Sequence, residues 1–309
     1  MIPAYNPSKD YLEQMLQGVL DQDPGPEHMQ IEVVDDGSPM VDVAVLVREI
    51  AGDRVNVYCS PVNHGLAGCW NSCIERARGE WVHILHQDDL VLPGFYNCFE
   101  LLIQSNQELD AAYSRYLFAD ADGHWKVISR LEMRVAGELK EFDRMIATSQ
   151  CVQCAAVVVK RSTYQRLGGY RDDIPYVLDW EMWCRIAAVG RWGYVPQPGA
   201  VYREHLQSET ERLRRSGKII PDILAGGKVA RSHFPQALQE QTASAFQDMF
   251  ATYLLKTAAA LYANGFLKEA GKMLDSFRRE AMIPEHRWTW LWLRFRILIK
   301  PLRRMVRDS

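Results

Sequence analysis

The sequence predicts an α/β fold, with a mostly parallel central sheet flanked by helices and an all-α appendage at its C-terminal end. Strand-like and helix-like segments alternate over residues 1–120. Acidic clusters directly follow two of the predicted strands, at the sheet edge where ligands collect in this class. Beyond about residue 210 the apolar pattern is helical only. We therefore divide the chain into a first domain, 1–210, and a helical region, 211–309.

The composition bounds the classes of function. The formal net charge is −3 and the pI about 6.3, so nucleic acid is not an expected partner. Seven cysteines and no secretory signal at the start predict reduced thiols in the cytoplasm. Cys151 and Cys154 have the spacing of a redox or metal pair but run into an apolar strand, so we expect both to be buried. No apolar run in the sequence approaches the ~20 residues of a transmembrane helix.

Residues 1–80 predict three strand–helix units. Each strand is a short apolar run, and each helix has apolar residues at the 3.6-residue period. Ser8 is placed to cap the first helix, Ser38-Pro39 to begin the second and Gly79 to close the third. Only two residues precede Pro3 in the first strand, so we expect either a true start further upstream or a tolerated short strand. The strands are 1–5, 31–34 and 55–58, and the helical stripes are 12–20, 40–50 and 66–78.

The chain is organised around the stretch from Trp81 to Pro93. Its first five residues predict a buried strand, which ends at two adjacent acids, Asp88 and Asp89. Adjacent carboxylates repel each other at such a position unless a cation lies between them and another group. The stretch therefore indicates a cation site, and the alternative is a solvated turn without a ligand.

The pattern changes between residues 110 and 210. Residues 111–118 and 125–128 flank Asp120-Ala-Asp-Gly123, which has the chemistry of a hairpin turn. A further strand is predicted over 155–159 and a last one over 192–195. Helices are predicted over 161–167, which Gly168-Gly169 ends, and over 179–188.

Several short segments resemble inverting GT-A glycosyltransferases of family 2, in their bacterial type. The resemblance covers about residues 1–210, and the segments follow one another in the order found in that family. It implies a GT-A fold, a Rossmann-like sheet that binds a nucleotide sugar. The segments are Ile2–Asn6, Val33–Ser38, Asn63–Gly65 with Asn71, Ala77–Glu80, His86–Asp89 with Pro93, Gly168–Tyr170, Asp179–Trp183 and Tyr202–His205.

The resemblance implies a divalent metal, Mg²⁺ or Mn²⁺, which neutralises the diphosphate of the donor. Asp89 is the expected direct ligand, and Asp88 is expected nearer the ribose or the water shell of the metal. His205 is a further candidate ligand of the metal or diphosphate, and Arg203 would counter the phosphate charge. His86 stands where the family often has an acid, which leaves two carboxylates in place of three.

The resemblance also implies a pocket for the nucleotide base. Tyr5 would supply a stacking face, Pro3 its carbonyl, and Asp36 an acceptor for the ring N–H of the base. An acid with a stacking aromatic suits a pyrimidine, which favours a UDP-sugar, and a dTDP- or GDP-sugar is the alternative. The alternative for Asp35-Asp36-Gly37-Ser38 is a helix cap and turn without a ligand.

Inversion at the anomeric carbon needs a general base that removes the proton of the attacking acceptor hydroxyl. In the family this base is an acid at a helix start, six residues before an arginine, and Asp179 and Arg185 keep that spacing. Asp179 is therefore the expected catalytic residue. Glu181 is the second choice because it would point away on a helix. The alternative role for Asp179 is to cap the helix and complement its dipole.

The C-terminal part has two features. Residues 258–277 resemble one helix–turn–helix unit of the tetratricopeptide type, which we expect to be a packing appendage because a single unit cannot bury its own face. The last segment predicts either an interfacial helix on an anionic membrane or a helix docked on the catalytic domain. It interleaves Trp288, Trp290, Leu291, Trp292, Leu293, Phe295, Ile297, Leu298 and Ile299 with Arg294, Arg296, Lys300, Arg303, Arg304 and Arg307.

The resemblance implies a metal-dependent inverting glycosyltransferase that acts on a glycan or lipid-linked acceptor in cell-surface polysaccharide synthesis. We expect it in the cytoplasm, or peripheral at the inner face of the membrane. Two alternatives stay open. A catalytically impaired GT-A-like scaffold or binding protein is suggested by His86 and the short first strand. A nucleotidyltransferase would need a Gly-rich basic loop after that strand, where Tyr5–Lys9 has no glycine.

Overall fold

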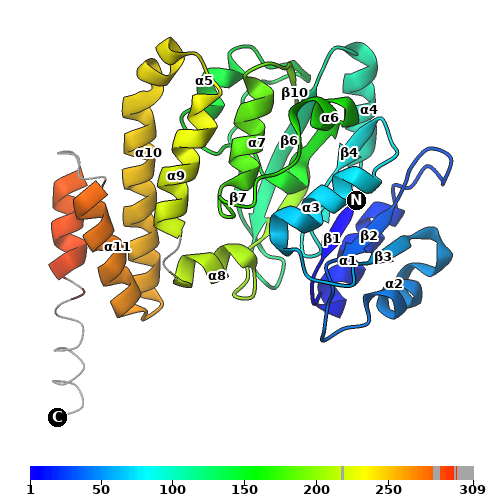
Figure 1. The fold of residues 1–309 in the computed structure, drawn as a ribbon, viewed down its shortest axis with the longest axis horizontal. Helices are drawn as coiled ribbons and strands as arrows, with labels where there is room; N and C mark the ends of the chain where they lie inside the picture. The colour runs from blue at the N-terminus through cyan, green and yellow to red at the C-terminus, as the bar shows by residue number, and fades with distance from the viewer. Residues whose placement is uncertain (217–218, 281–285, 296, 298–309) are drawn as a thin grey trace.

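The computed structural model describes residues 1–216, 219–280, 286–295 and 297. Figure 1 shows two sheets at one side and a stack of helices at the other. The first sheet is parallel, with the order β1-β2-β3, and is built from β1 (Ile2–Ala4), β2 (Glu32–Asp35) and β3 (Asn56–Cys59). Its strands alternate with α1 (Lys9–Leu20), α2 (Val43–Ala51) and α3 (Gly65–Arg76), as the sequence predicts.

The second sheet is mixed, in the order β4-β9-β6-β10-β5. Among its described strands only β6 and β10 pair in parallel, while β7 forms a hairpin with β6 and β8 pairs with β10. The α/β class is thus confirmed, and antiparallel pairs are commoner in this sheet than the sequence predicts. Its strands are β4 (Trp81–His83), β5 (Leu90–Val91), β6 (Ala111–Ala119), β7 (Trp125–Ile128), β8 (Gly137–Glu138), β9 (Val157–Lys160) and β10 (Trp192–Arg203).

The two sheets meet at Met1. Its amino group donates to the carbonyl of His83 at 2.9 Å, and its own carbonyl accepts from the amide of Leu85 at 3.1 Å. The short strand β1 therefore lies between β2 and the segment that leads from β4 to the acidic pair. This places the ends of β1, β2 and β4 side by side.

Both faces of the sheets are covered by helices. Consecutive residues of β9 show this, because Val157 and Val159 lie in one apolar cluster and Val158 in the other. One cluster includes residues of α1, α2 and α4 (Phe95–Ser105). The other cluster is larger and includes residues of α3, α6, α7 and the C-terminal helices. The remaining helices of this part are α5 (Phe142–Ile146), α6 (Arg161–Leu167) and α7 (Leu178–Ala187).

The predicted start of the second helix is wrong. The helix begins at Val43, and its N-cap is Asp42, whose carboxylate accepts from the amide of Val45 at 3.0 Å. Ser38 instead donates its hydroxyl to Asp35 and accepts from the amide of Asn6 at 2.7 Å. The Ser-Pro pair therefore ties the ends of β1 and β2 together, because a hydroxyl serves a loop contact as well as a helix cap.

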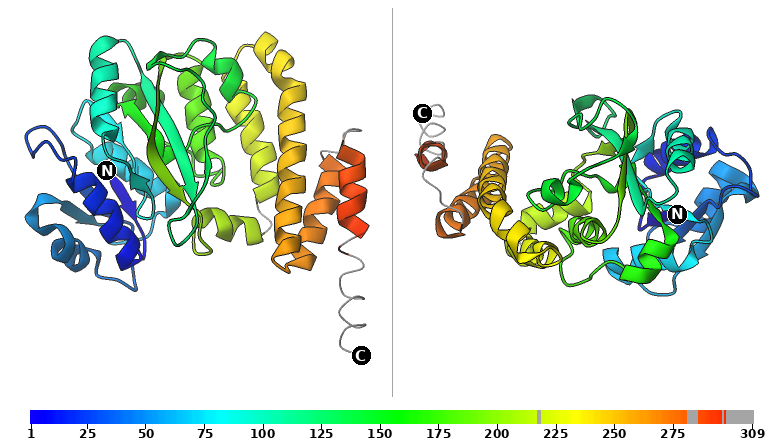
Figure 2. Two further views of the ribbon diagram at one scale, coloured as in Figure 1. Left: turned by 180° about the vertical axis from the view of Figure 1, so that it is seen from behind. Right: turned by 90° about the horizontal axis from the view of Figure 1, so that it is seen from above.

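The C-terminal part is helical, as predicted, and lies at the end of the molecule opposite β1–β3 (Figure 2). Residues 287–295 continue it as a further helix. None of the described helices combines the length and the apolarity that crossing a bilayer requires. Of the predicted terminal segment, Arg296, Leu298, Ile299, Lys300, Arg303, Arg304 and Arg307 lie outside the described residues. The helices are α8 (Glu209–Ser216), α9 (Ile219–Ser232), α10 (Gln236–Ala263) and α11 (Leu267–Glu280).

The helical region is joined to the first domain through α7 and the segment before it. Glu181 is buried and bonds to His233, which follows α9, at 2.7 Å. Trp180 stacks on Phe246 of α10, with ring centroids 5.8 Å apart. The hydroxyl of Tyr176 lies 2.8 Å from that of Tyr253. The division at residue 210 stays a prediction, but these contacts show that α9 and α10 pack directly on the helix that carries Asp179.

Candidate active site

A cavity of about 1070 Å³ opens where the ends of β1, β2 and β10 meet the turn after β4 and the start of α7. Residues from the start of α8 also line it, so the helical region contributes to its wall. Of the residues predicted from the sequence, all except Asp89 and Glu181 line this cavity. They are Pro3, Tyr5, Asp36, His86, Asp88, Asp179, Arg203 and His205.

Asp88 and His205 form a pair on the cavity wall. Nε2 of His205 lies 2.7 Å from Oδ2 of Asp88. This hydrogen bond, with the charge of the carboxylate, raises the pKa of His205 above its ordinary value. The fold brings the two residues together because the turn after β4 and the end of β10 lie at the same edge of the sheet.

Asp89 points away from the cavity and is only 1% exposed. Its Oδ1 accepts the backbone N–H of Arg203 at 2.9 Å, and Oδ2 lies 3.5 Å from Nδ1 of His86. Burial raises the pKa of the Asp89 carboxyl. Asp88 therefore faces the cavity, while Asp89 ties the turn to β10, and which of the two acids binds a metal directly stays a prediction.

The donor set of this turn fits a divalent cation. One ligand atom each from His86, Asp88 and Asp89 lies within 4.8 Å of the others. Oδ2 of Asp89 and Nε2 of His86 are buried and have no hydrogen-bond partner among the described residues. Carboxylate oxygens with few protein ligands suit Mg²⁺ or Mn²⁺, and imidazole nitrogen is an accepted ligand of first-row metals. Metal binding itself stays a prediction.

The pocket predicted for the base is built on a clamp that the sequence analysis missed. The side-chain amide of Gln87 accepts the N–H of Tyr5 at 2.8 Å and donates to the carbonyl of Tyr5 at 3.2 Å. Gln87 therefore ties the end of β1 to the turn that carries Asp88. The ring of Tyr5 stays 46% exposed and lines the cavity, so a planar base has a free face to stack on.

Asp36 is buried at the end of β2. Its two carboxylate oxygens accept the backbone N–H groups of His64 and Gly65 at 2.8 and 2.9 Å. Burial nevertheless raises the pKa of Asp36. Each oxygen keeps a second lone pair, so the carboxylate that holds this loop also has acceptor capacity toward the cavity. Each acid of the Asp35–Asp36 pair therefore has a structural contact. Asp36 holds the loop at His64 and Gly65, and Asp35 accepts the hydroxyl of Ser38.

Asp179 lies in the first turn of α7 and lines the cavity. Its Oδ2 accepts from the amide group of Gln150 at 2.7 Å, and Oδ1 accepts the N–H of Trp180 at 2.6 Å. Burial raises the pKa of Asp179 to about 6. The N-cap of the helix is Val177, so Asp179 does not occupy the cap position that the alternative interpretation gave it. Gln150 was missed, because nothing in the sequence links it to a residue so far along the chain.

Glu181 does not line the cavity. It is 1% exposed and bonds to Arg185 at 2.6 Å in addition to His233. Burial by itself would raise the pKa of Glu181, but the hydrogen bonds from His233 and Arg185 outweigh it, and the pKa is lowered. A carboxylate held by two basic partners is a poor proton acceptor, so the geometry does not support Glu181 as the base.

Arg203 lines the cavity but is only 3% exposed. Its guanidinium donates to Gln14 at 2.7 Å and lies over the ring of Tyr11, 4.2 Å from its centroid. The Tyr11 ring also packs on His205, with centroids 5.2 Å apart. Arg203 therefore positions His205 and the end of β10. Tyr11 and Gln14 were missed, although the helical period puts both outside the apolar stripe of α1.

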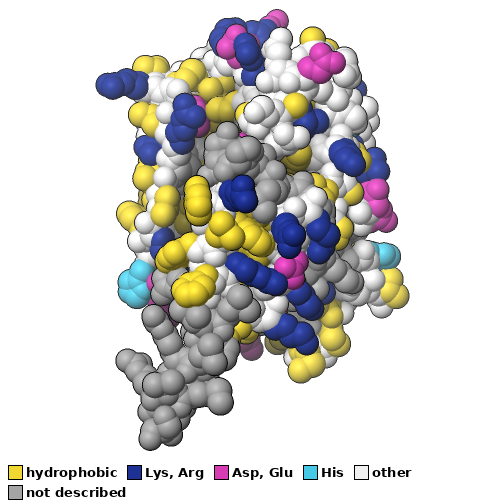
Figure 3. All heavy atoms as spheres, turned by 90° about the vertical axis from the view of Figure 1, so that its left-hand side faces the viewer, with side chains coloured by type: hydrophobic (Ala, Val, Ile, Leu, Met, Phe, Trp, Pro, Cys, Tyr) yellow, Lys and Arg dark blue, Asp and Glu magenta, His cyan; other side chains and the backbone are white. Residues whose placement is uncertain are grey.

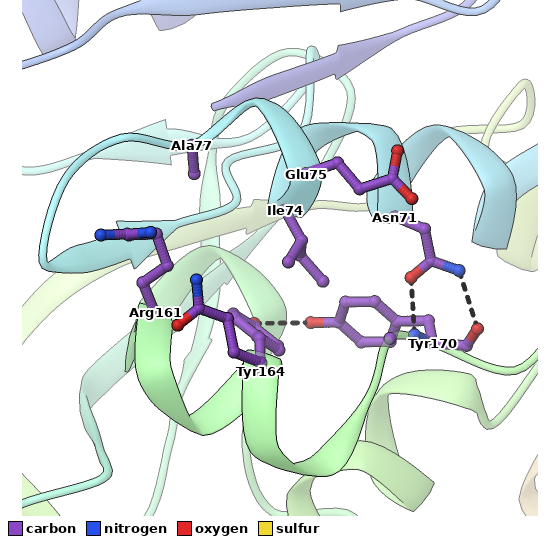
Figure 4. Close-up of a pocket in the computed structure, with 9 residues that line it drawn as sticks. Asn71, Ile74, Glu75, Ala77, Arg161, Tyr164 and Tyr170 are labelled. Atoms are coloured by element: carbon purple, nitrogen blue, oxygen red, sulfur yellow. Dashed lines mark hydrogen bonds between the residues drawn. The ribbon is translucent and has the colours of Figure 1, made fainter.

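The loop that precedes α7 is held by Asn71, which borders a second cavity of about 390 Å³. Figure 4 shows the Asn71 amide facing the backbone of Tyr170. The side-chain oxygen accepts the N–H of Tyr170 at 2.6 Å, and the amide nitrogen donates to its carbonyl at 2.9 Å. The hydroxyl of Tyr170 lies 3.1 Å from that of Tyr164 on α6. This side-chain clamp fixes the chain nine residues before Asp179.

Replacing Gly169 with alanine is expected to loosen this clamp. A Cβ at residue 169 would lie 2.2 Å from Oδ1 of Asn71, so the amide must shift and lose its bonds to Tyr170. We expect the free energy of unfolding to fall by about 1–3 kcal/mol, measured by urea denaturation. Gly137→Ala is the matched control, because a Cβ there meets nothing within 4 Å. Equal stability of the two variants would contradict the role given to the clamp.

Comparison with known proteins identifies the family of the chain. The profile described as "Glycosyl transferase family 2" matches residues 1–167. TuaG of Bacillus subtilis (strain 168), a glycosyltransferase named for teichuronic acid biosynthesis, is 35% identical over 88 residues, which are 28% of this chain and 34% of TuaG. The minor teichoic acid biosynthesis protein GgaB of the same organism is 28% identical over 123 residues, 39% of this chain and 13% of GgaB. The chain thus spans about a third or less of each of these two relatives.

The fold also matches a solved structure. The crystal structure of S. aureus TarS 1–349 in complex with UDP-GlcNAc aligns with a TM-score of 0.57, at 15% sequence identity, over 90% of both chains. This likeness shows the fold, and it confirms a GT-A architecture with additional helices. Because the family profile covers more than half of the 309 residues, the chain belongs to glycosyltransferase family 2.

Proposed function

We propose that this glycosyltransferase moves a sugar from a UDP-sugar to a hydroxyl group of a glycan or lipid-linked acceptor, with inversion and with a divalent metal. One observation carries the proposal: a single cavity is lined by the Asp88–His205 pair and by Asp179, which reach it from the sheet edge and from α7. The first two suit a metal-bound diphosphate, and the third suits an acceptor hydroxyl.

The donor is assigned to the side of the cavity formed by β1 and β2. Tyr5 supplies a stacking face, and Asp36 supplies an acceptor for the N–H of a pyrimidine. TarS was crystallised in complex with UDP-GlcNAc, which supports a UDP-sugar for a chain of the same fold. Asp88 and His205 on the cavity wall, with His86 and Asp89 of the same turn behind them, would hold Mg²⁺ or Mn²⁺ beside the diphosphate. Such a metal, when bound, supplies Lewis-acid stabilisation of the leaving diphosphate.

The acceptor is assigned to the side near α7. Oδ1 or Oδ2 of Asp179 takes the proton of the acceptor hydroxyl as that oxygen bonds to the anomeric carbon. The bond from this carbon to the diphosphate oxygen breaks in the same displacement, and its electron pair leaves with the diphosphate. Gln150 and the N–H of Trp180 orient the carboxylate for this step. Attack from the face opposite the leaving group gives inversion.

The class of acceptor is inferred from the relatives. GgaB and TuaG are named for the biosynthesis of teichoic acid and of teichuronic acid. Both acids are cell-surface polymers. A polymer of this kind grown on a lipid carrier would place the enzyme at the inner face of the membrane. We therefore assign a role in cell-surface polysaccharide synthesis at that face.

The pH dependence of transfer follows from the pKa of Asp179. A general base acts only in its deprotonated form, and burial raises the pKa of this carboxyl to about 6. We expect kcat/KM to fall about tenfold for each pH unit below 6 and to level off above it. Initial rates between pH 5 and pH 8, at saturating metal, measure this profile. A rate that is independent of pH through this range would contradict the assignment of the base.

The proposed function is tested by a screen of sugar nucleotides. Each is titrated calorimetrically with and without Mn²⁺, and its hydrolysis is followed in the absence of acceptor. A UDP-sugar should bind at least about tenfold more tightly with metal and should release free sugar slowly. Metal-dependent binding without any release of sugar would instead support the scaffold alternative. Absence of binding for every nucleotide would overturn the proposal.

A further inference from the structure

The outermost helix of the described structure, residues 287–295, has two apolar faces. One face packs inward: Leu293 is 3% exposed, and the indole N–H of Trp290 donates to the carbonyl of Leu274 on α11 at 2.8 Å. The other face is directed to solvent. It consists of Trp288, Leu291, Trp292 and Phe295, which are 78%, 40%, 55% and 60% exposed.

The exposed residues are spaced by three or four positions, so they form one continuous stripe along the helix. We call Trp288, Leu291, Trp292 and Phe295 the outer stripe. A helix that needs only to dock on its own domain has one apolar face, and the inner face already serves that purpose. Single exposed apolar residues are ordinary, but four in one stripe on a short helix indicate a contact with another surface.

Exposed basic side chains lie at the same end of the molecule as the outer stripe. Figure 3 shows this end of the molecule, where apolar side chains and Lys or Arg side chains lie next to one another. Arg287 is exposed and precedes the first tryptophan. Arg278 of α11 is also exposed and lies 5.9 Å from the ring centroid of Trp290, whereas Arg294 is paired with Asp275 at 3.2 Å. Between residues 286 and 307 the sequence has seven Lys or Arg and no Asp or Glu. The surface that the outer stripe meets should therefore be negatively charged.

We propose that the outer stripe and its basic neighbours bind the anionic surface of a lipid bilayer. Exposed tryptophan and phenylalanine beside arginine are the groups that enter the boundary between headgroups and acyl chains. A second copy of this chain is the poorer occupant, because two such faces would bring like charges together. This membrane-binding role rests on the proposed function, because a lipid-linked acceptor would lie at the membrane surface that the helix binds.

The full chain is tested by flotation with vesicles of phosphatidylcholine alone and with about 30% phosphatidylglycerol. We expect binding to the anionic vesicles, weaker binding at higher salt, and little binding to neutral ones. The double variant Trp288→Ser, Phe295→Ser should lower the partition coefficient at least about tenfold. Arg287→Glu should lower binding to the anionic vesicles only.

The matched control is Trp125→Ser with Val135→Ser, since these residues are 67% and 75% exposed in the first domain. This variant should bind vesicles as the unchanged protein does. Equal loss in both double variants, or no binding to anionic vesicles, overturns the proposal. So does a shift from dimer to monomer in the Trp288→Ser, Phe295→Ser variant without loss of vesicle binding. UDP binding with Mn²⁺ is measured in parallel. Absence of UDP binding would overturn the proposed function and leave the lipid result standing. Absence of vesicle binding would overturn the lipid proposal and leave the proposed function standing.

Discussion

The Asp179→Asn variant is expected to bind the donor normally and to transfer sugar about 10²–10⁴-fold more slowly, because the acceptor hydroxyl loses its proton acceptor. Asparagine keeps the shape of the side chain and an oxygen for the N–H of Trp180, which Asp179 accepts at 2.6 Å. The loss should appear in kcat for transfer. Calorimetry of UDP with Mn²⁺ and initial rates with acceptor measure the two effects separately.

This variant should also remain folded. Burial raises the pKa of Asp179 to about 6, above its ordinary value of 3.8. The folded state therefore binds the proton more tightly than the unfolded state, and above pH 6 the buried charge makes folding less favourable. A neutral asparagine removes that cost. Asp173→Asn is the matched control, because Asp173 is exposed and pairs with Arg171 outside the cavity. Transfer that survives in Asp179→Asn, or is lost in both variants, would refute the assignment.

The Asp88→Ala variant is expected to lose metal-dependent donor binding, and this is the second large effect. Asp88 and His205 face the cavity together, so removing the carboxylate removes the anionic ligand from the proposed metal site. We expect the enhancement of UDP binding by Mn²⁺ to fall at least about tenfold. His205→Ala should lower the enhancement in the same direction. Titration of UDP with and without Mn²⁺ measures both.

The Asp89→Asn variant distinguishes the role of Asp89 from that of Asp88. Asparagine preserves an acceptor for the N–H of Arg203, which Asp89 binds at 2.9 Å. We expect this variant to change the free energy of unfolding by about 1–3 kcal/mol and to keep most of the Mn²⁺ effect on UDP binding. If Asp89→Asn abolished that effect while Asp88→Ala retained it, the metal ligands would be those predicted from the sequence order, and our structural assignment would be wrong.

Most of the residues predicted for the site line one cavity in the structure, because each motif is tied to the end of a regular element. Asp36 directly follows β2, Asp88 lies in the turn after β4 and Asp179 lies in the first turn of α7. Once the strands are found from their apolar pattern, an α/β sheet brings these ends to one edge. The family resemblance covers the same segments, and the profile match over residues 1–167 agrees with it.

The orientation of each side chain was harder to predict. Asp88 and Asp89 are adjacent in the sequence, and their roles depend on the backbone N–H of Arg203, which lies 114 residues away. His205 reaches Asp88 across a similar separation. Contacts of this kind leave no periodic signal in a single sequence. The same reason explains why Gln87 and Gln150 were missed, since each is a polar residue whose only distinguishing feature is its partner in space.

The start of the second helix shows a different limit. Ser38-Pro39 has the chemistry of a helix start, but the hydroxyl of Ser38 bonds to Asp35 and the true cap is Asp42. Local preference allows two N-caps, Ser38 and Asp42, which are four residues apart. In the structure Ser38 bonds within the loop after β2, and Asp42 is left as the cap. A tertiary contact therefore decided between two locally acceptable structures.

The bond between Glu181 and His233 has a consequence for anyone who wishes to graft a new acceptor specificity onto this chain. Exchanging the helical region at residue 210 would remove His233 from Glu181. The Glu181 carboxylate is 1% exposed and lies two positions from Asp179, the proposed base. Arg185 alone would then pair with this buried carboxylate, and we expect the first turn of α7 to become less stable. A chimaera should therefore take α7, α9 and the start of α10 from the same parent protein. The junction between the two parent sequences should lie outside this segment.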